Sequence, residues 1–286
     1  MSEASAQTVL QQMGMPALAG GIAVCFSHPL ELTKVRLQLD NERGLRGEPR
    51  MYRGWIDCVR QNFHAHGVRG LQRGLSLGEY TALAFAGAIS FEDGVKITKA
   101  RGEAMQAASE AAKSGMCSVI GLSSDKVDEL CKAASEASGE QVQIANYLCN
   151  GNYACSGSMA AVEKVMEIAK PEFKARMVVK LAVAGAFHTD FMAPAAEALT
   201  AGLADTPIET PKIPVISNVD VEPHADADSI RATLAKQLTS PVQWEKTLTT
   251  LLAGGLETST EVGPGKVIAG IMKRVDKKAV CENFTV

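Results

Sequence analysis

A Gly-x-Ser-x-Gly pattern runs from Gly74 to Gly78, with Ser76 at its centre. This spacing is typical of a nucleophile elbow, a sharp turn that exposes a serine hydroxyl at the start of a helix. A serine hydroxyl is a weak nucleophile at neutral pH and needs a base within hydrogen-bond reach, a task that suits the pKa of histidine. His188 follows an apolar, strand-like stretch and precedes a helix that begins near Met192. The sequence therefore predicts that Ser76 is a nucleophile and that His188 is its base.

The chain between these two residues alternates between helical and strand-like patterns. Apolar residues at helical spacing after Ser76 predict two helices, with a break at Gly87 and at residues 90–93. Residues 114–183 then read as β-α-β-β-α-β, with the turn "NGN" between the second and third strands. This order predicts a ferredoxin-like subdomain inserted before His188.

Composition excludes several classes of function. The 286 residues carry 29 Lys and Arg against 32 Asp and Glu, which argues against a nucleic-acid-binding protein. The charge is uneven, because residues 1–75 have 9 basic and 6 acidic side chains and the remainder has 20 and 26. The seven cysteines include no Cys-x-x-Cys pair, so we expect reduced, mostly buried thiols and no metal site.

The first 75 residues have a different character from the rest. The run from Ala4 to Leu30 has no charged side chain, is rich in small residues and is long enough to cross a bilayer, although it also contains glutamines and His28. Both a membrane-spanning helix and a soluble core helix fit this run. The beginning of the chain lacks the pattern of a secretory signal and makes a poor transit peptide.

Residues 10–74 resemble one repeat of the mitochondrial carrier family. The segment "HPLELTKVRLQLD" has Pro29, Glu31, Lys34 and Arg36 at the spacing of the family signature, and "YRGWIDCVRQNFHAHGVRGLQRG" is similar to its matrix segment, with His66 where an acidic residue is usual. The resemblance implies helices and a possible membrane association through residues 10–38. A solvated helix face is the alternative for the charged residues. Because carriers have three such repeats, transport by this chain alone is not expected.

Residues 76–286 resemble malonyl-CoA:acyl carrier protein transacylases of bacteria and plastids. The likeness rests on ordered motifs, namely "SLGEYTALAFAGAISFEDGVKITKARGEAMQ", "NYLCNGNYACSG", "VAGAFHTDFMAPA", "IPVISNVD", "KQLTSPVQW" and "EVGPGKV". It implies that Ser76 forms a malonyl ester, that His188 moves the proton, and that the backbone N–H of Leu77 stabilises the oxyanion. Plastid or mitochondrion is then a more natural location than cytosol.

The resemblance assigns roles to three more residues. Arg101 would bind the malonyl carboxylate through its planar guanidinium, although alone it would read as a surface arginine. The backbone carbonyl of Gln237 would orient the His188 imidazole. Asn218 and the "GPG" of residues 263–265 would shape the site, or simply form turns.

The sequence also departs from the transacylase pattern before Ser76. Leu75 stands where the family has histidine, the family loop Gly-Gln-Gly-Ser-Gln does not occur, and "VRGLQRG" is unlike the buried strand that leads into an elbow. We therefore expect a composite chain, joined near residue 75 to a transacylase without its first third, and impaired activity. A gene fusion and an incorrectly assembled gene would leave the same sequence.

These interpretations predict an α/β fold with an incomplete, doubly wound hydrolase-like sheet, an inserted ferredoxin-like α+β subdomain and an N-terminal helical, carrier-like segment. The expected domains are residues 1–75, residues 76–113 with 184–286, and residues 114–183. The expected partners are malonyl-CoA and acyl carrier protein, with no cofactor and no metal. Basic side chains near the cleft would meet the carrier protein, and the candidates by type are Lys96, Lys99, Lys174 and Arg176.

Two alternatives to an active transacylase are open. An inert chain could be tethered to a membrane by the partial carrier repeat. An esterase of ordinary α/β-hydrolase order would need a histidine near the end of the chain, where the last one is His224. The polar loop "EPHADAD" around His224 is expected to be exposed to solvent, which disfavours the esterase.

Overall fold

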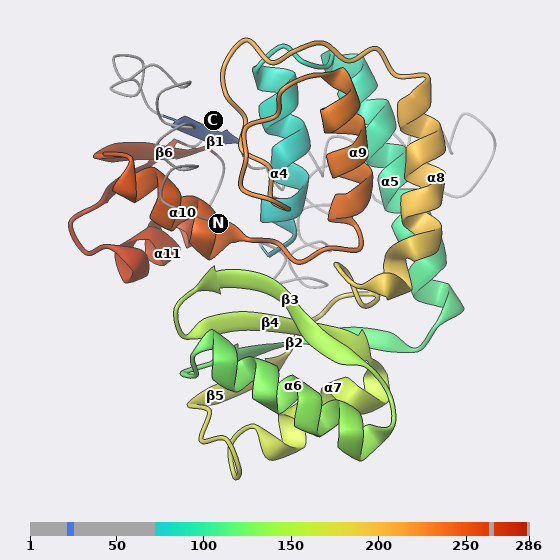
Figure 1. Cartoon of the computed structure of the whole chain (residues 1–286), viewed down its shortest axis with the longest axis vertical. Coiled ribbons are helices and arrows are strands. Elements are labelled where there is room, and N and C mark those ends of the chain that lie inside the picture. Colours follow the sequence, from blue (N-terminus) through green and yellow to red (C-terminus); the bar gives the residue numbers. More distant parts are fainter. Residues whose placement is uncertain (1–21, 26–71, 263–265, 285–286) are drawn as a thin grey trace, which may run out of the picture.

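The computed structural model describes residues 22–25, 72–262 and 266–284 and shows a mixed α/β fold (Figure 1). The predicted helices of the carrier-like segment and the "GPG" of residues 263–265 therefore lie largely outside the described residues. Two groups of elements are visible. One is a four-stranded sheet with two helices, and the other combines a parallel sheet with the helices that carry Ser76, Arg101 and Gln237 (Figure 1).

The four-stranded sheet has the predicted β-α-β-β-α-β order. Its strands are β2 (Ser114–Ile120), β3 (Val142–Cys149), β4 (Asn152–Ser158) and β5 (Met177–Lys180), arranged β3-β4-β2-β5 with antiparallel neighbours. Helices α6 (Ser124–Ser138) and α7 (Met159–Ile168) pack together against it (Figure 1).

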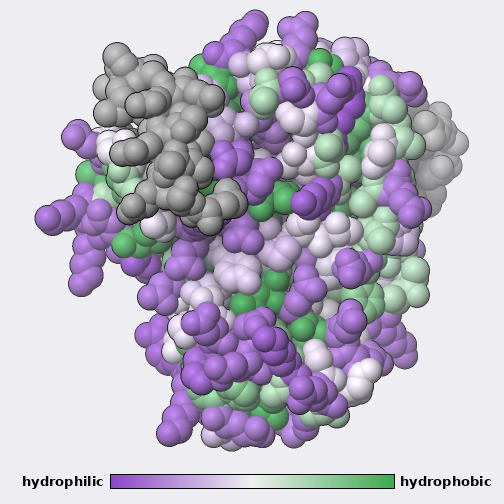
Figure 2. Space-filling view, viewed as in Figure 1, coloured by the Kyte–Doolittle hydropathy of each residue, from purple (hydrophilic) through white to green (hydrophobic). Residues whose placement is uncertain are grey.

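Helix α6 shows why this unit forms. Its apolar residues, among them Val127, Leu130 and Ala134, recur at helical spacing and are buried. The side chains at this end of the molecule that face solvent are mostly hydrophilic (Figure 2). The helix therefore presents one apolar stripe to the sheet.

The helices of the second group begin with α4 (Gln72–Phe85) and α5 (Phe91–Ala111). The predicted break at Gly87 and Ser90 lies between them, whereas residues 91–93, also predicted as part of the break, form the first turn of α5. Gly87 adopts a φ of 73°, and the Ser90 side chain caps α5 by accepting a hydrogen bond from the Asp93 N–H at 3.0 Å. Helix α5 packs against α8 (Ala193–Ala204), which packs against α9 (Ala227–Gln237). Leu83, Leu199 and Leu234 lie fully inside this bundle.

The parallel sheet contains a strand that the sequence analysis did not predict. Strand β1 (Ile22–Cys25) pairs with β6 (Thr258–Val262), which pairs with β7 (Val280–Phe284), all in parallel. Helices α10 (Trp244–Ala253) and α11 (Val267–Val275) lie beside this sheet, where α11 contacts β7 (Figure 1). Helix α4 contacts β1. The prediction of a helix is therefore wrong at residues 22–25, where a short apolar run fits a strand as well as a helix.

The end of β6 and the start of α11 are joined by Glu261. Its carboxylate is buried and accepts hydrogen bonds from the backbone N–H groups of Val267, Ile268 and Ala269, each at 3.1 Å. These groups have no partner inside the helix, and a negative charge there is favoured by the helix dipole. The glutamate of the "EVGPGKV" motif is thus a structural cap.

Two further expectations concern membranes and thiols. Within the described ranges, no helix is long and apolar enough to cross a membrane, and the proposed association through residues 10–38 finds no support there. Cys117, Cys131, Cys149 and Cys155 are buried free thiols, as predicted, whereas Cys281 is partly exposed. The same part of the chain holds no cluster of three or more His, Cys, Asp or Glu side chains that fits a metal ion.

Candidate active site

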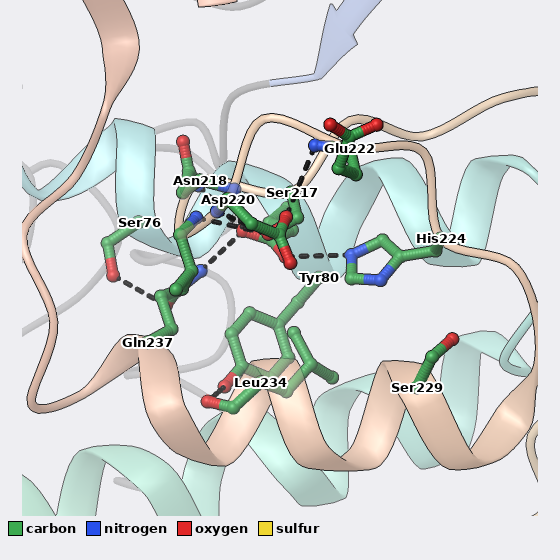
Figure 3. Close-up of polar contacts among 12 residues, drawn as sticks. Ser76, Tyr80, Ser217, Asn218, Asp220, Glu222, His224, Ser229, Leu234 and Gln237 are labelled. Atoms are coloured by element: carbon green, nitrogen blue, oxygen red, sulfur yellow. Dashed lines mark hydrogen bonds and ion pairs between the residues drawn. The ribbon is translucent and has the colours of Figure 1, made fainter. Parts of the chain in front are cut away.

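Three predicted site residues from separate helices meet around the Ser76 hydroxyl. Ser76 lies in α4 and is 4% exposed. Its Oγ donates a hydrogen bond to Gln237 Oε1 at the end of α9 (2.9 Å; Figure 3). It accepts one from Arg101 Nη2 of α5 (2.5 Å). Arg101 Nη2 also donates to Gln237 Oε1 at 3.3 Å. The fold therefore brings together a hydroxyl, a guanidinium and an amide that are up to 161 residues apart in sequence.

His188 lies on the loop between β5 and the short helix η3 (Asp190–Met192). Its Nδ1 is 2.8 Å from the backbone oxygen of Gln237. Because a carbonyl oxygen can only accept, Nδ1 carries the proton and Nε2 keeps the lone pair that a base needs. Gln237 thus contacts the histidine through its main chain and the serine through its side chain.

The backbone of His188 is held in a rare conformation. Its φ is 62°, in the left-handed region that few residues other than glycine adopt. The four-stranded sheet anchors the loop, since Ser156 Oγ donates to the Phe187 oxygen at 2.8 Å and Gln143 Nε2 to the His188 oxygen at 3.5 Å. Strained backbone of this kind concentrates at functional sites.

The serine and the histidine are not hydrogen-bonded to one another. Among the hydrogen bonds of residues 72–262, the Ser76 hydroxyl donates to Gln237 and none joins it to His188. Proton transfer to His188 therefore requires the hydroxyl to turn away from the Gln237 side chain.

Burial and charge keep the His188 imidazole neutral. Its pKa is lowered to about 4, because burial, the largest effect, and the nearby Arg101 charge outweigh the opposing effect of the Gln237 carbonyl. A neutral imidazole is the form that acts as a base.

This pKa leads to a prediction about pH. Labelling of Ser76 by a serine-directed fluorophosphonate should persist below pH 6.5, the ordinary pKa of histidine, and decline only near pH 4. The sign follows because a base with a lowered pKa loses activity only when the pH falls through that lower value. Rates of adduct formation by intact mass, measured where circular dichroism shows folded protein, test this. A decline centred near 6.5 would contradict it.

The Arg101 guanidinium is buried beside Tyr80. The residue is 7% exposed and lies 5.3 Å from the centroid of the Tyr80 ring. Within the described structure its Nε has no hydrogen-bond partner, although the atom is buried. Burial raises the pKa of Tyr80 to about 12, so the phenol stays neutral and cannot balance the guanidinium charge. A buried N–H without a partner is costly, and a carboxylate oxygen would satisfy it.

The nucleophile elbow itself is not formed. Helix α4 begins at Gln72, so Ser76 stands inside it rather than on a turn before it. In the described residues, the non-glycine positions with positive φ are Lys174, His188 and Val221, and Ser76 is not among them. Helix geometry pairs the Leu77 N–H with the carbonyl of Arg73. The Leu77 N–H is therefore occupied and would reach an oxyanion only if α4 began at Ser76.

Glu79 is a site residue that the sequence analysis missed. It stands three residues after Ser76 on the same helix face, and its Oε2 accepts hydrogen bonds from Gln237 Nε2 (2.7 Å) and from Asn218 Nδ2 (2.8 Å) and N (3.0 Å). Asn218 Nδ2 also donates to the Leu75 oxygen at 3.0 Å. The predicted supporting residue Asn218 therefore links the start of α4 to Glu79.

The expectation that His224 is exposed is wrong. His224 Nε2 lies 2.8 Å from Glu79 Oε1, and both side chains are almost fully buried (Figure 3). The polar residues around His224 suggest a solvent-exposed loop. The buried Glu79 carboxylate, however, needs a partner that its own helix cannot supply, and His224 is that partner. His224 thus contacts Glu79 and makes no direct hydrogen bond to Ser76 among those of the described residues.

Leu75, which replaces the family's histidine, belongs to the core. It is 4% exposed and packs in one apolar cluster with Trp244 and Leu248 of α10. The buried apolar side chain of Leu75, the residue before Ser76, therefore stabilises the position of α4.

Two protein-family models match parts of the chain. The acyl transferase domain family matches residues 63–283, and the mitochondrial carrier protein family matches residues 5–92. Residues 63–92 are thus matched by both, and this overlap includes the Gly74–Gly78 pattern.

Individual relatives agree with the first match. The chain is 39% identical to the malonyl CoA-acyl carrier protein transacylase of Bacillus subtilis over 77% of this chain and 69% of that protein. An acyl carrier protein S-malonyltransferase from Vibrio cholerae superposes with a TM-score of 0.72 at 29% identity, covering 93% of this chain and 94% of the other.

A third relative is a malonyl-transacylase solved in complex with its type II PKS acyl-carrier protein, with a TM-score of 0.72 and 26% identity over 93% of each chain. Together with the arrangement of Ser76, Arg101, His188 and Gln237, these matches show that the chain belongs to the malonyl CoA-acyl carrier protein transacylase family.

Proposed function

We propose that the chain transfers a malonyl group from malonyl-CoA to acyl carrier protein, as in fatty acid synthesis. The observation that carries this proposal is the buried Arg101 guanidinium, which contacts the Ser76 hydroxyl and keeps an unpartnered Nε. A cation beside the nucleophile suits an acyl group that itself ends in a carboxylate.

The reaction follows from the chemistry of the three residues. Ser76 Oγ attacks the thioester carbonyl, its proton passes to His188 Nε2, and collapse of the tetrahedral intermediate forms the Ser76 ester while the proton moves to the CoA thiolate. The phosphopantetheine thiol of acyl carrier protein then gives its proton to His188 and attacks the ester. The proton returns to Ser76, which is regenerated. Serine-ester chemistry of this kind uses no metal and no bound cofactor.

Arg101 would select the acyl group. The malonyl carboxylate can accept hydrogen bonds from Nε and a terminal nitrogen of the guanidinium together, which acetyl cannot. The carboxylate would also neutralise the charge that lowers the pKa of His188, and so make the imidazole a stronger base once substrate is bound.

We also propose that turnover is lower than in full-length relatives. The chain has no Gly-Gln-Gly-Ser-Gln loop to supply a second oxyanion donor, and the first, the Leu77 N–H, lies inside α4. Loss of one such donor costs about 10²–10³-fold in rate. In this view residues 76–113 and 184–286 are an incomplete, doubly wound large subdomain, residues 114–183 are the small one, and residues 1–75 are the carrier-derived part.

The carrier protein is the second proposed partner. The relative that was solved with an acyl-carrier protein supports this. Lys96, Lys99, Lys174 and Arg176 are all exposed, as a docking role requires. Lys96 already pairs with Asp93 at 3.1 Å on α5, which leaves the other three as the better candidates.

The test is an intact mass measurement. Purified protein incubated with malonyl-CoA should gain one malonyl group, and the Ser76→Ala variant should gain none. Folded wild-type protein without an adduct would overturn the proposal. An adduct that persists in Ser76→Ala would place the ester on another residue.

A further inference from the structure

The Glu79 carboxylate has no assigned role in malonyl transfer, yet it is one of the most completely bonded groups near Ser76. The side chain is 1% exposed and accepts three hydrogen bonds on Oε2 and contacts His224 on Oε1. It touches neither Ser76 nor Arg101 directly in the hydrogen bonds of the described residues. Any influence on the reaction must therefore pass through its partners.

Gln237 is the partner that reaches the reacting groups. Its side chain is fully buried, with Nε2 donating to Glu79 and Oε1 accepting from Ser76 and Arg101. Figure 3 shows the contact between Ser76 and Gln237. The two ends of the amide are thus held by groups of opposite character, a carboxylate on one side and a guanidinium on the other.

Reversal of this amide would be unfavourable at both ends. The amide oxygen would face the Glu79 carboxylate, and the NH₂ group would face the Arg101 guanidinium, so that two acceptors and two donors would oppose each other. In a buried site these contacts cannot be replaced by water. The acceptor oxygen of Glu79 therefore determines that the Gln237 amide presents an acceptor, and not a donor, to Arg101.

We infer that Glu79 is a positioning residue for the recognition of the substrate carboxylate, and that it acts through the Gln237 side chain on Arg101. The inference rests on the proposed malonyl transfer. With the amide fixed, one Arg101 terminal nitrogen is held between Gln237 Oε1 and Ser76 Oγ, and the unpartnered Nε is left for the malonyl carboxylate. If the Gln237 amide were not fixed, the Arg101 guanidinium would lose Gln237 Oε1 as an acceptor, and its orientation would no longer be defined.

The test compares malonyl-CoA with acetyl-CoA. In Glu79→Met, which keeps the length of the side chain and removes its acceptors, the ratio of kcat/KM for malonyl-CoA to that for acetyl-CoA should fall about 10-fold or more, as expected for a lost hydrogen bond to a charged group. Glu79→Gln should recover most of the ratio, because its amide oxygen can still accept from Gln237 Nε2. Val162→Ala, at a fully buried position of the four-stranded unit, controls for lost stability and should leave the ratio unchanged.

Gln237 provides a second variant if Glu79→Met does not fold. Gln237→Met removes the acceptor for Arg101 and keeps the backbone carbonyl for His188, so it should lower the same ratio. In a Gln237→Met background, Glu79→Met should lower the ratio no further. An unchanged ratio in folded Glu79→Met, or in Gln237→Met, would overturn the inference.

A spectroscopic measurement separates this inference from the proposed function. The buried Arg101 Nε–H should give a slowly exchanging ¹H–¹⁵N resonance, assigned by its absence in Arg101→Lys. It should move in Glu79→Met and stay in place in Val162→Ala. If the wild type forms no malonyl ester, the proposed function fails, and a resonance that does not move in Glu79→Met still refutes the link between Glu79 and Arg101.

Discussion

Replacement of His188 by alanine should lower the rate of Ser76 acylation by malonyl-CoA about 10²–10⁴-fold, the usual contribution of a positioned base. Without His188 Nε2, the Ser76 hydroxyl keeps Gln237 Oε1 as its acceptor, and an amide oxygen is too weak a base to remove the proton. Single-turnover measurements by intact mass would follow the malonyl adduct with time, and circular dichroism would show that the variant is folded.

A second variant at His188 separates chemistry from structure. His188→Asn places its amide nitrogen near the position of Nδ1, so it can still donate a hydrogen bond to the Gln237 carbonyl, but it offers no basic nitrogen. It should be as slow as His188→Ala. If His188→Asn recovered wild-type acylation, the histidine would serve to hold the loop, and the base would be another group.

Completion of the N-terminal part should raise turnover strongly. In a chimera, residues 1–75 are replaced by the corresponding part of the Bacillus subtilis relative, up to the residue before its nucleophile. This should supply the proposed second oxyanion donor and free the Leu77 N–H, for a gain in kcat of at least about 10²–10³-fold, the typical value of a single donor. The measurement is malonyl transfer to acyl carrier protein at saturating malonyl-CoA.

The control for the chimera is its own Ser76→Ala variant, which should be inactive. If the chimera were no faster than the original chain, residues 1–75 would not be what limits turnover at Ser76. The proposal of impaired turnover would then be wrong, while the assignment of Ser76 and His188 would be unaffected.

Local patterns predicted much of this fold. Alternation and helical spacing were sufficient for the unit formed by residues 114–183, and the break before α5 could be placed because the capping of α5 by Ser90 is a local interaction. Strand β1 was not predicted, since an apolar run flanked by small residues is ambiguous between helix and strand until its partner β6 is known.

The candidate active site, like the fold, can be predicted from the sequence only in part. Ser76, Arg101, His188 and Gln237 could be named from motifs, and the structure brings them together. Glu79 and His224 are 145 residues apart, and neither lies in a pattern that predicts the other. The register of α4 also depends on residues before Ser76, so the state of the Leu77 N–H could not be read from the Gly-x-Ser-x-Gly spacing alone.

Strand β1 shows what an edge position of the parallel sheet requires of the sequence. Its four residues fall within the mitochondrial carrier match, whereas its partner β6 falls within the acyl transferase match. The pairing uses backbone N–H and C=O groups, which every non-proline residue carries, so this edge of β6 can be paired by a strand of either match. A strand position at the edge of this sheet therefore requires an extended backbone more than a particular sequence, whereas the contacts of Ser76, Arg101 and Gln237 require particular side chains.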